Sequence, residues 1–184
     1  MSKLLRKLLQ YIILPAALLV VSRVAGIYFA VNFFNLDFFL ETQPEQIYSL
    51  QIYFTNQADA LLASSISNLT MLITISSLAV YYLIKYRLSI LAAYNPKVLV
   101  KLNNLNLMPW VNNKNNTFLK TFVWITFLWI VSIILIADVL SQDSSLWIAI
   151  LSFLTAIIST WALIRTFEIE GEIIYPHSKV SNLY

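Results

Sequence analysis

The chain has 184 residues, of which 59% are hydrophobic and 11% are charged, with a formal net charge of +3. A typical soluble domain is about 45–50% apolar and about 25% charged, so this composition excludes an ordinary soluble enzyme and a disordered chain. A separate soluble domain needs about 100 residues or more, for which little room remains. We therefore expect a single membrane domain that covers residues 1–184.

Four stretches are long and apolar enough to cross a bilayer. A crossing helix needs about 20 mostly apolar residues, because each residue rises about 1.5 Å and the hydrocarbon core is about 30 Å thick. Backbone groups in lipid must find partners within the chain, which favours helices. The predicted fold is an all-α integral membrane protein, a four-transmembrane-helix bundle. Its crossings cover residues of about 8–34, 60–86, 119–139 and 145–166, followed by a tail at 167–184.

The first crossing is preceded by Lys3, Arg6 and Lys7, as a signal peptide would be. Its apolar run is too long for a usual signal peptide, and no cleavage site with small residues follows it at the right place. We expect a retained anchor.

Lysine and arginine indicate the orientation. Outside the predicted crossings, they all fall on the side that holds the N-terminus, the loop at about 87–118 and the C-terminal tail. The other side, at about 36–60 and 138–145, carries Asp and Glu but neither Lys nor Arg. By the positive-inside rule, both termini are expected in the cytoplasm. The small size and the sharp asymmetry favour a bacterial cytoplasmic (inner) membrane.

The outer loop, at 35–58, is predicted to contain a short interfacial amphipathic helix. Thr42 and Glu45 have the spacing of a capping box. Apolar residues follow at helical spacing, as on a helix that lies on the membrane surface; they are Ile47, Leu50 and Phe54. A further helix start follows at Asn56, so the second crossing is expected to begin outside the bilayer.

The inner loop is predicted to contain a second amphipathic helix, at 95–109. Asn95 and Pro96 indicate an N-cap followed by proline at the first helical position. This helix either binds anionic lipid or connects the bundle ends by packing against them. Its two lysines supply only about 2 kcal/mol of lipid attraction, which favours the connector. Its apolar stripe consists of Val98, Leu99, Leu102, Leu105 and Met108.

The region after the fourth crossing is ambiguous. Residues 168–175 alternate charged and apolar side chains, as a short strand would. Gly171 is equally suited to end the fourth helix.

Arg23 is the exception within the first crossing. It lies near the middle, where an arginine costs roughly 2.5–3.5 kcal/mol. The sequence offers no carboxylate at that depth, because Asp138 lies near the outer end of the third helix and Glu168 lies beyond the inner end of the fourth. Arg23 then reaches neutral oxygens, water, a lipid phosphate or another chain, or it snorkels to an interface from a shorter or tilted helix. Possible neutral neighbours are Ser22, Asn32 and the hydroxyls of the second helix.

Small and hydroxyl residues recur every three or four positions on one face of the second crossing. Such residues let helices approach closely and form hydrogen bonds across them. A pore or ligand cleft is the alternative, although the scattered hydroxyls of the third and fourth crossings argue against a pore within one monomer. The candidate helix-packing or partner-contact residues are Arg23, Ala63, Ser67, Thr70, Thr74 and Ser77.

The sequence contains no cysteine, one histidine and two glycines, and lacks paired carboxylates at membrane depth. No catalytic, metal or cofactor-binding residue, no cofactor and no nucleic-acid partner are therefore predicted. We expect a non-catalytic multi-pass membrane protein, a subunit or scaffold whose partners are the lipid bilayer and another membrane protein or a second copy. The alternative is a small oligomeric channel or transport component that uses Arg23 and the hydroxyl row. An enzyme of lipid or envelope metabolism is disfavoured.

Overall fold

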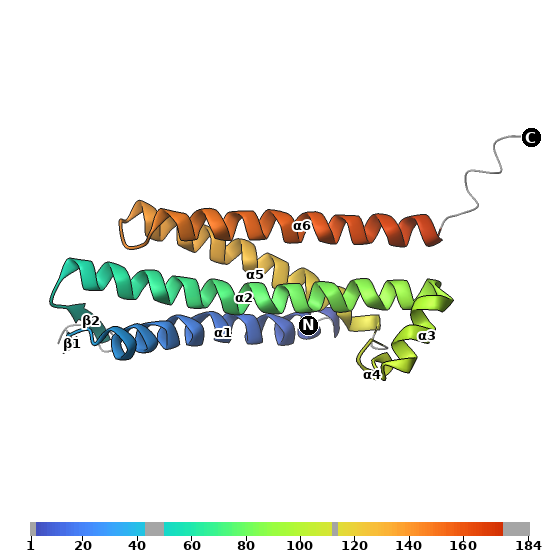
Figure 1. Ribbon diagram of the computed structural model, residues 1–184, viewed down its shortest axis with the longest axis horizontal. Helices are drawn as coiled ribbons and strands as arrows, with labels where there is room; N and C mark the ends of the chain where they lie inside the picture. Colours follow the sequence, from blue (N-terminus) through green and yellow to red (C-terminus); the bar gives the residue numbers. More distant parts are fainter. Residues whose placement is uncertain (1–2, 43–49, 112–113, 175–184) are drawn as a thin grey trace, which may run out of the picture.

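The structure is a computed structural model that describes residues 3–42, 50–111 and 114–174. Within these residues, four long helices lie side by side as a bundle (Figure 1). Each contains a stretch long and apolar enough to cross a membrane, which confirms the predicted number of helices of this length and composition. The helices are α1 (Lys3–Phe34), α2 (Gln57–Tyr94), α5 (Lys114–Leu140) and α6 (Leu146–Ile174).

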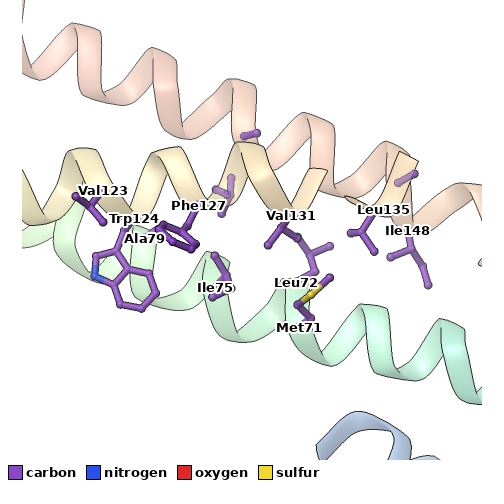
Figure 2. Packing of buried hydrophobic residues seen from close by; sticks show 13 residues of the cluster. Met71, Leu72, Ile75, Ala79, Val123, Trp124, Phe127, Val131, Leu135 and Ile148 are labelled. Carbon is purple, nitrogen blue, oxygen red and sulfur yellow. The ribbon is translucent and has the colours of Figure 1, made fainter. Parts of the chain in front are cut away.

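The main core lies between α2, the central helix, and α5. Met71, Leu72 and Ile75 of α2 face Val131 and Leu135 of α5 (Figure 2). All five side chains are essentially fully buried. Lipid tails are as apolar as these residues, so close packing rather than escape from water holds such helices together. The remaining helices pack around this pair, with α1 on α2 and α6 on both α2 and α5.

A short antiparallel hairpin connects α1 and α2. Strand β1 (Phe38–Thr42) pairs with β2 (Leu50–Phe54), with Phe38 opposite Phe54 and Thr42 opposite Leu50. The amphipathic helix predicted within 35–58 is therefore wrong where Leu50 and Phe54 were to form its apolar face. Aromatic and β-branched residues favour paired strands, and the capping-box spacing is only a local signal. The other residues of that prediction, at 43–49, lie outside the described part of the chain.

The predicted start of α2 is confirmed. Asn56 has an extended backbone and precedes the first helical residue, Gln57. The helix then runs without interruption to Tyr94, eight residues beyond the predicted end. At about 1.5 Å per residue, its 38 residues extend about 57 Å, so α2 is longer than a bilayer core is thick.

The inner loop forms α3 (Pro96–Asn104) and α4 (Met108–Val111). The predicted cap is confirmed, because the Asn95 side chain accepts a hydrogen bond of 3.1 Å from the Lys97 backbone N–H. Leu102 is buried in a small cluster that includes residues of α2 and α4. Leu99 and Leu105 are exposed, so only part of the predicted apolar stripe packs against the bundle end.

The helix α6 passes through Gly171 and ends at Ile174. Both interpretations of this region, a strand and a helix end at Gly171, are therefore wrong for residues 168–174. A glycine inside a helix costs only about 1 kcal/mol relative to alanine. The acidic residues that precede Gly171 make their contacts from helical positions: Glu168 pairs with Arg165 at 3.0 Å, and Glu170 accepts a hydrogen bond from Tyr86 of α2.

Candidate functional site

A group of interacting polar residues joins three of the long helices. It lies toward the end of the bundle that carries β1, β2 and the α5–α6 turn (Figure 1). We call this the hairpin end, and the opposite end, with α3 and α4, the α3 end. Residues of α1, α2 and α5 and of the α5–α6 turn contribute to the group.

Arg23 forms an ion pair with Asp138. The Arg23 Nη2 donates to Asp138 Oδ2 at 2.9 Å, and the Asn68 side-chain amide donates to the same oxygen at 3.0 Å. The expectation that Arg23 finds no carboxylate at its depth is therefore wrong. The helix α1 continues for about 16 Å beyond Arg23, whereas α5 ends two residues after Asp138. The position of Arg23 within its own apolar stretch therefore predicted the wrong depth: Arg23 lies near the end of α5, not at the middle of the apolar layer.

The ion pair lies at one boundary of the apolar part of the bundle. The stretch from Lys120 to Asp138 on α5 rises about 27 Å, and the stretch from Asn68 to Lys85 on α2 rises about 26 Å. Both values are close to the thickness of a bilayer core, about 30 Å. Arg23 therefore sits at the edge of an apolar layer, where its charge costs less than at the centre.

A groove of about 300 Å³ opens beside Arg23. Its polar lining includes Ser64 and Ser67 of α2 and Gln142 and Asp143 of the α5–α6 turn. The Arg23 side chain is 40% exposed, and Asp138 is 17% exposed. A guanidinium carries five N–H donors, and among the described residues one hydrogen bond of that group, to Asp138, is formed. The remaining donors are available at the groove.

The helices α1 and α2 cross closely next to the ion pair. The Ser67 hydroxyl donates to the Arg23 backbone carbonyl at 2.7 Å. A Cβ atom at Gly26 would lie only 2.5 Å from Ser67 Cα, so the crossing requires glycine on α1. Ala63 and Ser67 are fully buried. These two predicted residues therefore pack within the chain.

The rest of the predicted hydroxyl row is arranged differently. Thr70 and Thr74 donate to carbonyls of their own helix, each at 2.8 Å, to Ile66 and Thr70 respectively. Ser77 is exposed. The structure thus brings Arg23, Ala63, Ser67 and Thr70 to the α1–α2 contact, and it leaves Ser77 outside that contact.

Sequence reasoning missed Asp138 as the partner of Arg23, and it missed Asn68 as the second donor to the Asp138 carboxylate. The available signals were an asparagine inside an otherwise apolar stretch and an aspartate two residues before a helix end. Of the two other proposed neighbours of Arg23, Ser22 donates to Leu19 O and Asn32 donates to Tyr28 O. Among the described residues, no three His, Cys, Asp or Glu side chains gather as a metal site would require.

These features define the class of the protein: a multi-pass integral membrane protein with a bundle of four long apolar helices. Comparison with known protein families, curated proteins and solved structures finds no match to the chain.

Proposed function

We propose that the protein is a non-catalytic subunit or scaffold of a larger membrane assembly, and that another membrane protein docks on α1 beside Arg23. The half-exposed guanidinium at the edge of the apolar layer carries this proposal. A charge at that depth is stabilised by further hydrogen bonds. A partner helix with a carboxylate or amide opposite the groove would supply them.

The outer face of α1 supports the same conclusion. A smaller share of its apolar stretch is buried than in α5, 17% against 44%. Large apolar side chains are exposed along its length, as on a helix that meets lipid or another protein; they include Ile13, Val20, Val21, Val24, Tyr28 and Phe33. Val24 and Tyr28 of this face directly follow Arg23 and Ile27 of the groove lining in the sequence, and we infer that one partner helix can cover both.

The alternative is a small oligomeric channel or transport component that uses Arg23 and the hydroxyl row. Such a pore needs hydroxyls that are available to a shared cavity. The hydroxyls of Ser67, Thr70 and Thr74 donate to carbonyls within this chain. The subunit therefore remains the stronger proposal.

We further propose that the α3 end faces the cytoplasm of a bacterium and that the hairpin end lies outside the inner membrane. Apart from Arg23, which pairs with Asp138, the Lys and Arg of the described residues lie toward the α3 end, as the positive-inside rule requires of the cytoplasmic side. The α3 end carries Lys85, Arg87, Lys97, Lys101 and Lys120, whereas the hairpin end carries Asp37, Asp59, Asp138 and Asp143.

Site-specific photocrosslinking tests the docking proposal. A benzoylphenylalanine is placed at Val24 on α1 or at Ile158 on α6, two apolar positions that are each 62% exposed. After irradiation of intact membranes, Val24 should give one discrete protein adduct, and Ile158 should react with lipid. The Arg23→Leu substitution should weaken the Val24 adduct. Equal adducts from both positions, or lipid adducts alone, would contradict a specific partner on α1.

A further inference from the structure

We propose that a second pocket, at the α3 end, binds an alkylammonium group such as that of choline or of an amine lipid headgroup. The pocket has a volume of about 290 Å³, at the lower end of the range for small-molecule sites. Its lining comes from the end of α2, the start of α5 and the end of α6. These segments lie toward the α3 end of the bundle (Figure 1).

Aromatic rings from three different helices line this pocket. Phe118 of α5 and Phe167 of α6 lie 5.0 Å apart between ring centroids, and Tyr86 of α2 lies 5.7 Å and 6.0 Å from them. Tyr94 adds a fourth aromatic side chain to the lining. Aromatic rings attract a cation through their negative faces, and groups of them recognise alkylated ammonium ions.

Glu170 is the charged residue of the lining. Its Oε2 accepts a hydrogen bond of 2.8 Å from the Tyr86 hydroxyl, which fixes the carboxylate beside the rings. The neighbouring acid Glu168 instead pairs with Arg165. Among the described residues, no Lys or Arg lies within ion-pair distance of Glu170. The Glu170 carboxylate is therefore positioned by a tyrosine hydroxyl, with no side-chain cation of the described residues beside it, and a cationic ligand can pair with it.

The depth of the pocket suits a headgroup. Tyr86 follows Lys85 directly, and Phe118 lies two residues before Lys120. These lysines mark the polar boundary of the apolar layer at this end. Headgroups occupy this level of a bilayer, although a soluble amine can reach it from water as well. Both sources offer the same chemistry, an ammonium centre with alkyl substituents.

Isothermal titration of the full chain in nanodiscs of phosphatidylglycerol, which carries no amine, tests the site. Choline is the probe, and 3,3-dimethylbutanol, its neutral isostere, is the control ligand. Choline should bind saturably, and the isostere should not. Absence of choline binding, or equal binding of the isostere, would overturn the proposal.

Three variants locate the binding. Glu170→Gln keeps an acceptor for Tyr86 but removes the charge, and should weaken choline binding by at least about tenfold. Phe118→Leu keeps apolar bulk but removes an aromatic face, and should weaken it by about threefold. The matched control Glu168→Gln should leave the affinity unchanged. Equal choline affinities of the Glu170 and Glu168 variants would overturn the assignment of the site to this pocket. If the Glu170 variant does not fold, an unchanged choline affinity of Phe118→Leu would overturn it instead.

The nanodisc lipid then distinguishes the two sources of the ligand. If amine lipid is the natural occupant, discs that contain phosphatidylcholine or phosphatidylethanolamine should compete with free choline and weaken its apparent affinity. If a soluble amine is the occupant, the affinity should stay the same. Both results support an alkylammonium site, and neither depends on the docking of a partner at α1.

Discussion

The close crossing of α1 and α2 at Gly26 predicts that a larger residue at this position destabilises the protein. A Cβ atom at Gly26 would lie 2.5 Å from Ser67 Cα and 3.0 Å from Thr70 Cβ. The first of these neighbours is backbone, so no side-chain rotation relieves the clash, and Gly26→Ala must separate the two helices. Overpacking costs about 1–3 kcal/mol, whereas alanine recovers about 1 kcal/mol of helix propensity. Because the clashing atom is backbone, we take the upper part of the overpacking range, about 2–3 kcal/mol, and expect Gly26→Ala to lower the free energy of unfolding by a net of about 1–2 kcal/mol.

Gly171 provides the matched control, because it is the other glycine of the chain and a Cβ atom there meets nothing within 4 Å. Gly171→Ala should raise the free energy of unfolding by up to about 1 kcal/mol through helix propensity alone. Both variants are unfolded by SDS in the same mixed micelles, and tryptophan fluorescence follows the transition. If Gly26→Ala is as stable as the wild type or as Gly171→Ala, the reasoning about the crossing is refuted.

Two further predictions concern the charges. Replacing Arg23 or Asp138 with leucine should each cost about 1–3 kcal/mol of stability, because the remaining partner loses a charged hydrogen bond. The loss of stability in the double variant should be smaller than the sum of the two single losses, by a coupling energy of about 0.5–3 kcal/mol in the same SDS assay. Losses that add up would contradict the ion pair. Because the chain has no cysteine, Asp59→Cys and Lys97→Cys each introduce a single thiol. A membrane-impermeant maleimide should reach these two positions from opposite sides of the membrane, and labelling of both from one side would refute the proposed crossing of α2.

The sequence was informative where structure depends on local chemistry. Apolar runs of bilayer length predicted the four long helices, and Asn56 and Asn95 marked helix starts that the structure confirms. Local signals failed where a distant partner decides the outcome. The residues of β1 form a strand only because β2, which follows later in the chain, pairs with them. The capping-box spacing at Thr42 contains no information about that pairing.

The partner of Arg23 was not predictable for a similar reason. Its contact with Asp138 depends on how far α1 is displaced along the bundle relative to α5. Apolar periodicity determines which residues are helical, but it does not set the offset between two helices. That offset depends on where the helices fit closely together, and here α1 and α2 approach closely at Gly26 and Ser67.

The helices also differ in their capacity to deform, and this bears on how the two proposed sites are related. The central helix α2 contains neither proline nor glycine, two of the usual causes of a kink, and it is α-helical throughout. It connects Asn68 near the hairpin end with Tyr86 near the α3 end as one rod. In contrast, α1 contains Pro15 and Gly26, and it packs mainly against α2. A partner that docks on α1 can therefore shift this outer helix, and Arg23 with it, while α2 keeps Asn68 and Tyr86 fixed relative to each other.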